Sequence, residues 1–294
     1  MAPHSFVTEL SKDRFLRLKE DLLTQGFVLD KIPYAVFQAK KEGLSVTLYE
    51  SGKLVVQGKN SDDFIRYYLE PEILGALTYS HPSLSIDFTP KIGIDESGKG
   101  DLFGPLCVAG VYADKDGIQR LIDMGIKDSK QLQDSSIAKL SLQIQKEFKF
   151  DIIRISPEKY NPLYETFKNL NSLLAWGHAK TIENLIVKTG CHNVLIDQFA
   201  HEYVVANALK KKSIEVTLTQ RHKGESDPVV AAASILARHT FVLELERLGK
   251  EWEMTFPKGA GPAVKTAGSL FLQKHGRDLL PKVAKMHFKT VNEL

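Results

Sequence analysis

Two adjacent carboxylates, Asp95 and Glu96, follow a short apolar run and precede a loop that contains Gly98 and Gly100. Side chains alternate between the two faces of a strand, so neighbouring acids serve one site only where the strand breaks. The two glycines permit such a break. Closely spaced carboxylates repel each other, and a site with oxygen ligands alone suits Mg²⁺ or Mn²⁺. The segment therefore predicts a divalent-metal site, with a surface acidic turn as the alternative.

The same segment is close to a phosphate-binding loop, because Gly93, Gly98 and Lys99 have the required spacing. That motif needs Ser or Thr after the lysine to bind the metal, and this chain has Gly100 there. The two acids would also lie inside the loop and repel the phosphates. The pattern therefore disfavours a nucleotide-binding loop.

A third acid, Asp197, ends the apolar run 193–197. An acid at the end of a buried strand lies at the edge of the sheet, where open α/β sheets place their sites. A second interpretation stays open, in which Asp197 is a helix N-cap or a loop acid, because Gln198 is expected to begin a helix.

A fourth acid comes from the segment 221–238, where Glu225 and Asp227 precede a long Ala-rich run. Asp227 stands directly before Pro228, and proline favours the first position of a helix. We therefore expect Asp227 to be the helix N-cap. Glu225 is then the better candidate for metal binding or proton transfer, although either acid could fill that position.

The elements around these acids follow two patterns. The first part of the chain predicts a small α+β domain, with helices over 11–25 and from 61 and strands over 35–39, 44–49 and 54–57. From residue 91 the chain predicts an α/β domain, with strands over 92–94, 106–112, 152–155 and 194–196 and helices over 135–147, 171–188 and from 228. We expect an N-terminal domain over 1–80, a linker over 81–90 and a catalytic domain over 91–294.

Composition narrows the class of protein. The chain has 294 residues, of which 43% are hydrophobic, and a net charge of +3, which does not by itself indicate a nucleic-acid partner. Two separated cysteines argue against a disulfide scaffold or zinc site and fit a reducing compartment. We expect no membrane span and no signal peptide, and hence a cytoplasmic protein. The lysine- and arginine-rich segment 257–290 is either a phosphate-binding surface or a solvated face.

Three segments resemble the type-2 ribonuclease H family: residues 93–101, 127–132 and 230–238. They occur in the family's order, and the resemblance extends over about 91–290. It implies an RNase H-like mixed sheet with flanking helices and a site of four carboxylates. Carried over by position, the catalytic and metal-binding residues are Asp95, Glu96, Asp197 and Glu225.

The resemblance also implies a function. The expected activity is endonucleolytic hydrolysis of the RNA strand of an RNA–DNA hybrid with Mg²⁺ or Mn²⁺, giving 5′-phosphate and 3′-hydroxyl ends. The hybrid is the expected partner, and we expect a monomer without membrane contact. A glycine loop can sense 2′-hydroxyls. The expected substrate-binding residues are Gly98, Lys99, Gly100, Lys127, Ser129 and Lys130, although Ser129 is equally well explained by a helix-capping turn.

Two further features resemble the HIII branch of this family more than the HII branch. HIII proteins carry an N-terminal domain that resembles the TATA-box-binding protein, which agrees with the elements expected over 1–80. HII proteins mostly have a Tyr where this chain has Ala260, and use it to recognise a DNA–RNA junction. The alternatives are HII-like cleavage at single embedded ribonucleotides and a hybrid-binding protein without catalysis.

Overall fold

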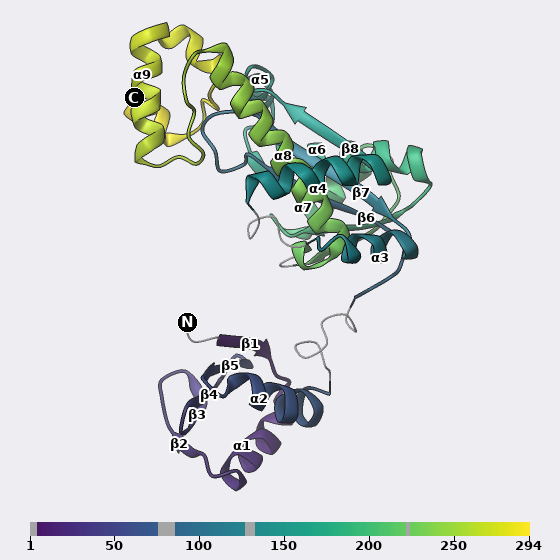
Figure 1. The fold of residues 1–294 in the computed structure, drawn as a ribbon, viewed down its shortest axis with the longest axis vertical. Coiled ribbons are helices and arrows are strands. Elements are labelled where there is room, and N and C mark those ends of the chain that lie inside the picture. The colour runs from purple at the N-terminus through teal and green to yellow at the C-terminus, as the bar shows by residue number, and fades with distance from the viewer. Residues whose placement is uncertain (1–4, 76–85, 127–132, 222–223) are drawn as a thin grey trace. The chain divides into compact units, whose positions relative to one another are not determined.

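The computed structural model describes residues 5–75, 86–126, 133–221 and 224–294, without the side chains of Glu202 and Glu225. The chain forms two compact units, Met1–Asp87 and Phe88–Leu294. Figure 1 shows their elements, and each unit is described by itself. Part of the predicted linker, 81–85, lies outside the described residues.

The first unit is an antiparallel five-stranded sheet with helices on one face. Its elements are β1 (Ser5–Glu9), η1 (Lys12–Arg14), α1 (Phe15–Thr24), β2 (Val28–Asp30), β3 (Ala35–Lys41), β4 (Leu44–Tyr49), β5 (Lys53–Gly58), α2 (Ser61–Phe64) and the π-helix η2 (Ile65–Leu74). The strand order is β1-β5-β4-β3-β2. Leu18 and Leu22 of α1 and Ile65 of η2 belong to one core with Val46 and Val56 of the sheet.

The alternation of burial along the strands of the first unit leaves the other face of its sheet open. In β5, for example, Leu54 and Val56 are buried, whereas Lys53 and Gln57 are exposed. The sequence did not indicate the two edge strands β1 and β2, because both are short and alternate between exposed and half-buried residues.

The second unit contains a mixed five-stranded sheet. Its elements are β6 (Lys91–Ser97), β7 (Leu106–Ala113), α3 (Lys115–Asp123), α4 (Asp134–Glu147), β8 (Lys149–Ile155), α5 (Pro157–Phe167), α6 (Leu170–Thr189), β9 (Asn193–Asp197), α7 (Glu202–Lys211), β10 (Thr217–Arg221), η5 (Gly224–Ser226), α8 (Pro228–Glu251), α9 (Pro262–His275), η6 (Arg277–Lys282) and η7 (Lys289–Glu293). The strand order is β10-β9-β6-β7-β8. Strands β6, β7 and β8 are antiparallel neighbours, and β9 and β10 run parallel to β6.

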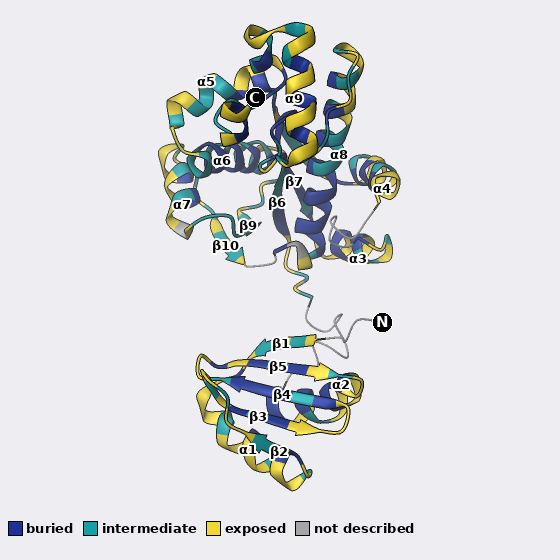
Figure 2. Ribbon diagram, turned by 90° about the vertical axis from the view of Figure 1, so that its left-hand side faces the viewer, coloured by how far each residue is buried: buried dark blue, intermediate teal, exposed yellow. Residues whose placement is uncertain are grey.

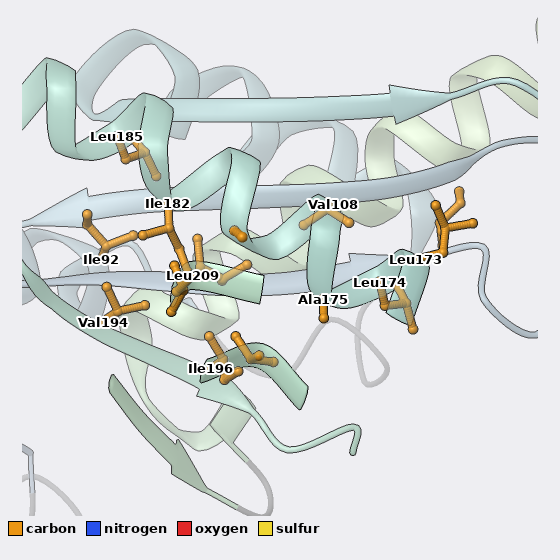
Figure 3. Close-up of a cluster of buried hydrophobic side chains, with 14 of the residues drawn as sticks. Ile92, Val108, Leu173, Leu174, Ala175, Ile182, Leu185, Val194, Ile196 and Leu209 are labelled. Atoms are coloured by element: carbon orange, nitrogen blue, oxygen red, sulfur yellow. The ribbon is translucent and has the colours of Figure 1, made fainter. Parts of the chain in front are cut away.

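Helices α6 and α8 cover opposite sides of this sheet, as Figure 2 shows. On the α6 side, Ile182 and Leu185 lie near Ile92 and Val194 of the strands, and Leu173 belongs to the same buried cluster at its other end (Figure 3). Helix α8 is long and apolar enough to cross a membrane, but 67% of its most apolar window is buried inside the protein. Its apolar surface is therefore used in the core of the second unit.

Strand β6 and helix α8 approach each other closely at Gly93. A side chain there would place its Cβ 2.5 Å from the backbone carbon of Val229, a distance that real structures essentially never show. Glycine at this position therefore allows the first turn of α8 to lie directly against β6. This contact fixes where the helix starts relative to the strand that carries Asp95 and Glu96.

The C-terminal segment builds a separate apolar cluster in which α9, η6 and η7 pack against the loop after β6. Phe103, Phe256 and Phe271 are among its buried members. Lys285 is fully buried beside it, and its Nζ donates to the carbonyls of Asp101 and Gly104 at 2.8 and 2.7 Å. The sequence counted Lys285 among possible phosphate-binding cations, but these contacts tie it to the protein backbone.

The predicted fold class is confirmed, namely a mixed α/β sheet with flanking helices plus a small N-terminal α+β unit. Two local expectations were wrong. The helix after Asp197 begins at Glu202 rather than Gln198, and β6 continues to Ser97 instead of breaking at the acids. Strand β6 persists because Asp95, Glu96 and Ser97 all remain paired with β7. Strand β10, like β1 and β2, was not expected.

Candidate active site

The register of two parallel strands brings the first and third acids together. Ile94 of β6 lies opposite Ile196 of β9, so Asp95 and Asp197 are neighbours at the next position. Residues in register on adjacent strands point to the same face of a sheet. The charge of Asp197 acts on Asp95 in this arrangement. The sheet therefore places two carboxylates, separated by about one hundred residues in the chain, side by side where β9 ends.

Glu96 lies on the other face of β6, but it lines one cavity together with Asp95 and Asp197. Asp95 accepts a hydrogen bond from Ser234 of α8, whereas Glu96 Oε2 lies 3.1 Å from His178 Nε2 on α6. The alternation of faces along a strand explains this division between the two covering helices. The predicted break of the strand is therefore not needed, because both acids line one cavity although they lie on opposite faces of β6.

The environment of Asp95 is short of positive charge. Burial and the neighbouring charge of Glu96 raise the pKa of Asp95 to about 8, and the charge of Asp197 adds to this rise. The hydrogen bonds from Ser234 and from the backbone N–H of Glu96, at 2.8 Å, act in the opposite direction. A carboxyl in this position keeps its proton near neutral pH unless a cation offsets the repulsion.

Glu96, in contrast, has a lysine and a histidine as partners, Lys99 and His178. Burial works to raise its pKa, but His178 and Lys99 outweigh burial, so the net pKa of Glu96 is below its usual value. Lys99 Nζ lies 3.4 Å from Glu96 Oε1 and 5.5 Å from the centre of the Phe199 ring. The other neighbour of Phe199 is the His178 ring, at 4.7 Å between centroids. Phe199 thus packs between the two partners of Glu96.

The loop after Glu96 turns sharply at Gly98. This residue has φ +89°, and a Cβ there would lie 2.2 Å from the Pro105 carbonyl oxygen, so only glycine fits. The turn places Gly98, Lys99 and Gly100 in the wall of the same cavity as the acids. The three residues expected to contact substrate therefore lie together beside the candidate catalytic residues.

The loop that carries Ala260 is anchored next to this turn. Asp101 Oδ1 accepts a hydrogen bond from the Gly259 N–H at 2.6 Å, and the Gly259 carbonyl accepts one from Leu102 at 2.9 Å. Phe256, the aromatic residue nearest to Ala260 in the sequence, is buried and packs on Phe103 with 4.8 Å between ring centroids. The Phe256 ring is therefore part of the core.

The two candidates for the fourth acid have different surroundings. The N–H of Gly224 donates to Asp197 Oδ1 at 2.8 Å, so the backbone of η5, on which Glu225 lies, begins against Asp197. Asp227 instead accepts from the Val229 N–H at 2.9 Å and pairs with Lys91 Nζ at 3.1 Å.

The role of Asp227 as the N-cap of α8 is thereby confirmed. Both members of its ion pair are almost fully buried, with 5% and 8% of the Lys91 and Asp227 side chains exposed. Lys91 begins β6, four residues before Asp95 and hence about 13 Å away along the strand. Asp227 is thus engaged at the opposite end of β6, and Glu225 remains the predicted fourth acid.

Other predicted substrate contacts lie outside the described residues, namely Lys127, Ser129 and Lys130. The structure resumes beside them at Asp134 of α4, which joins two cations. Arg238 of α8 contacts Asp134 Oδ1 at 2.9 Å, and Lys258 contacts its Oδ2 at 2.7 Å. Arg238 also lines the cavity that contains Asp95 and Glu96, so Asp134 links that cavity to the loop of Ala260.

The candidate catalytic cavity has a volume of about 330 Å³ and is lined by Asp95, Glu96, Ser97, Gly98, Lys99, Gly100, Asp197, Gln198, Phe199, Ser234 and Arg238. Among the described side chains, no group of three or more His, Cys, Asp or Glu residues is gathered closely enough to hold a metal ion. The chemistry of the donors nevertheless fits a hard divalent cation, because they are buried carboxylate oxygens, and burial together with the charges of Glu96 and Asp197 raises the pKa of Asp95.

Sequence reasoning missed four residues of this site: His178, Phe199, Ser234 and Arg238. A lone histidine in an apolar helix is indistinguishable from a core residue by pattern alone. Ser234 and Arg238 were noticed only as part of the family-like segment 230–238. Their spacing of four residues puts both on one face of α8, and that signal could have marked them.

The sheet order and the acids at the ends of β6 and β9 agree with the resemblance to type-2 ribonucleases H. The family described as Ribonuclease HII matches residues 92–291, and a domain of unknown function (DUF3378) matches residues 5–75. The chain belongs to the ribonuclease HII family.

Relatives over the whole length refine this assignment. The chain is 52% identical to ribonuclease HIII of Protochlamydia amoebophila, with 98% of this chain and 96% of that protein covered. It is 47% identical to ribonuclease HIII of Chlamydia felis, over 98% and 97% of the two chains. These matches place the chain in the ribonuclease HIII branch of the family, as an endoribonuclease.

Solved structures agree with the fold. A crystal structure of Bst-RNase HIII in complex with Mn²⁺ has a TM-score of 0.69 and 26% identity, covering 99% of this chain and 97% of that one. Aquifex aeolicus RNase H3 has a TM-score of 0.58 and 25% identity, covering 97% and 100%. The predicted family is thereby confirmed.

Proposed function

We propose that this protein hydrolyses the RNA strand of RNA–DNA hybrids with Mg²⁺ or Mn²⁺, and that it leaves 5′-phosphate and 3′-hydroxyl ends. The observation that carries the proposal is that the parallel strands β6 and β9 bring Asp95 and Asp197 into one cavity together with Glu96. The Mn²⁺ in the structure of Bst-RNase HIII supports a divalent cation.

The carboxylates of Asp95, Glu96, Asp197 and Glu225 would hold the cations. When bound, such cations lower the pKa of the attacking water and stabilise the leaving 3′-oxygen. The protein supplies alignment: Ser234 orients Asp95, and His178 orients Glu96. The Gly98–Gly100 loop offers backbone N–H groups and the Lys99 cation to the strand whose 2′-hydroxyls identify it as RNA.

The finer substrate preference follows from Ala260. Its methyl group is too short to stack on a deoxyribose at a DNA–RNA junction, and Phe256 is buried in the core. We therefore expect efficient cleavage of continuous hybrids and poor cleavage at a single ribonucleotide embedded in DNA. Comparable rates on both substrates, at one metal and salt concentration, would favour the HII-like alternative.

The test of the proposed function is cleavage of an end-labelled hybrid. EDTA should stop cleavage, and added Mg²⁺ or Mn²⁺ should restore it. Asp95→Asn and Asp197→Asn should each abolish cleavage in a folded protein, because each removes a ligand charge. Asp123→Asn, an acid-to-amide change on the exposed end of α3, is the matched control. Near-normal turnover of Asp95→Asn would contradict the mechanism, whereas a wild-type protein that binds the hybrid but leaves it uncut would favour the hybrid-binding alternative.

The remaining parts of the proposal concern the domain boundaries, the cellular compartment and the oligomeric state. We place an N-terminal substrate-binding domain at 1–80, a linker at 81–90 and the catalytic domain at 91–294. The protein would act as a cytoplasmic monomer. Both cysteines are free thiols, which fits a reducing compartment.

A further inference from the structure

A second and larger cavity adjoins the catalytic one. It has a volume of about 1040 Å³ and lies between helices α6 and α7, with the loop after β9 at one end. We call it the α6–α7 groove and define it by Asn171 and Trp176 of α6, Tyr203 and Lys211 of α7, and the loop 198–201. Gln198 and Phe199 line both cavities, so the groove continues directly from the candidate active site.

The walls of the α6–α7 groove carry aromatic rings in pairs. On one side, Phe167 lies beside Trp176, with 6.2 Å between their ring centroids. On the other side, His201 and Tyr203 are stacked with centroids 5.9 Å apart and planes inclined by 12°. The Tyr203 side chain is 64% exposed, so its ring face is accessible to a ligand. Such rings offer stacking surfaces to flat, aromatic ligands.

The polar residues described in the lining of the α6–α7 groove differ from those of the candidate catalytic cavity. Among the described residues that line the groove there is no Asp or Glu, in contrast to the neighbouring acidic cavity. The lining instead contains the amides of Asn171 and Asn207 and the cations of Lys211 and Lys212, of which Lys212 is paired with Glu183 at 3.0 Å. Lys211 lies in the last turn of α7 and is exposed. Amides pair with base edges, and lysines attract phosphates.

We propose that the α6–α7 groove binds unpaired nucleotides that extend from the end of the hybrid held at the catalytic cavity. Aromatic stacking surfaces and cations along a groove are the combination that binds single-stranded nucleic acid without regard to sequence. The volume exceeds that of most sites for one small molecule, which suits more than one nucleotide. This inference deepens the proposed function and rests on it for the position of the hybrid.

Direct binding can be read from Trp176, because the chain has two tryptophans and Trp252 lies outside the groove. Trp252→Phe leaves Trp176 as the only tryptophan. The Trp252 indole N–H is buried without a hydrogen-bond partner among the described residues, so this change sacrifices no described bond. Titration with a six-nucleotide single-stranded RNA should then quench Trp176 fluorescence saturably.

Variants of the groove locate the binding. In the Trp252→Phe background, Tyr203→Ala should raise the Kd at least about fivefold, the lower end of the effect of losing one stacked base. Lys211→Gln should make the slope of log Kd against log salt shallower by about 0.7. Leu142→Ala on α4, which removes a side chain that is also 64% exposed, is the matched control and should change neither.

Cleavage assays connect the groove to the substrate. The wild-type KM should be lower for a hybrid with a six-nucleotide single-stranded extension than for a blunt hybrid, and Tyr203→Ala should remove that gain but leave blunt-hybrid cleavage unchanged. A gain from an RNA extension assigns the groove to the RNA strand, and a gain from a DNA extension assigns it to the DNA strand.

Equal KM values for blunt and extended hybrids, or a full gain retained by Tyr203→Ala, would overturn the inference. Failure of the proposed function is distinguishable from this, because the wild-type protein would then leave even the blunt hybrid uncut.

Discussion

At the scale of single residues, His178 is the least expected part of the site. It is fully buried, and its Nδ1 has no hydrogen-bond partner among the described residues, so its one polar contact is Nε2 with Glu96. When Nε2 carries the proton, the ring donates to the carboxylate and restricts its rotation. We therefore expect His178 to orient Glu96 in addition to filling space in the core.

His178→Phe should weaken Mn²⁺ binding and hybrid cleavage by about 10- to 100-fold, the usual cost of removing a group that orients a metal-binding side chain. His178→Gln should recover much of both, because the glutamine amide can donate from nearly the position of Nε2. Mn²⁺ titration and kcat measured side by side provide the check. Equal losses in the two variants, or unchanged Mn²⁺ affinity in His178→Phe, would assign His178 to packing.

The sequence predicted Asp95, Glu96 and Asp197 because each acid interrupts an apolar run, and such runs identify buried strands. It could not predict His178, because nothing in the sequence near α6 shows that this face of the helix meets the end of β6. The contact exists only through the sheet order. The same reason hid Phe199, whose position depends on both Lys99 and His178.

At the scale of elements, the start of α8 separates the two candidates for the fourth acid. Glu225→Gln should lower cleavage strongly with little change in stability. Asp227→Asn should instead destabilise the fold by about 3 kcal/mol or more, because it leaves Lys91 buried without its partner charge. Capping alone would have predicted a smaller loss, since Asn also caps helices well.

Matched urea denaturation and cleavage assays test this ranking. Lys91→Met combined with Asp227→Asn should recover part of the lost stability, because the unpaired charge is gone. If Asp227→Asn were stable but inactive and Glu225→Gln were active, the fourth acid would be Asp227.

The contact between the C-terminal segment and the loop after β6 should depend on pH through Lys285. Burial lowers the pKa of Lys285 to about 7, while the unfolded chain keeps this amine charged to about 10.5. Between these values the unfolded state binds more protons, so stability rises with pH. The free energy of unfolding of the wild type minus that of Lys285→Met should therefore rise by up to about 1.4 kcal/mol per pH unit from pH 7 upward.

Urea denaturation of both proteins at pH 7, 8, 9 and 10 measures that difference and cancels the groups they share. A difference that stays flat would show that the carbonyls of Asp101 and Gly104 keep Lys285 charged throughout.

The sequence predicted some helices and strands better than others. The long helices α6 and α8 and the central strands were visible because their apolar residues recur over many positions. Strand β10 lies at the sheet edge, and three of its five residues are polar and exposed, namely Thr217, Thr219 and Arg221, so its sequence resembles a loop. Its pairing with β9, a long-range contact, makes it a strand.

At the scale of the whole molecule, the open sheet face of the N-terminal unit is the candidate surface for the hybrid. Lys40 and Lys53 are exposed on its strands, although Lys40 also pairs with Asp30 at 3.3 Å. Removal of residues 1–80 should raise KM for a long hybrid and leave the metal requirement unchanged. It should also make the dependence of binding on salt shallower, since fewer phosphates are neutralised.

Lys40→Gln with Lys53→Gln tests the same idea in the full chain, and should lower the salt slope by about one for each lysine that contacts a phosphate. Lys19→Gln on the exposed part of α1 is the control. An unchanged KM for the truncated protein at physiological salt would mean that the N-terminal unit serves another purpose.

The parallel pairing of β6 with β9 also fixes when the enzyme becomes active during its own synthesis. Asp95 and Asp197 are 197 − 95 = 102 residues apart, and a ribosome adds about 5–20 residues per second. Asp95 is therefore made about 5–20 s before its neighbour exists, and α8, which covers this side of the sheet, follows later still. A nascent chain therefore carries no assembled site until most of its length has been translated.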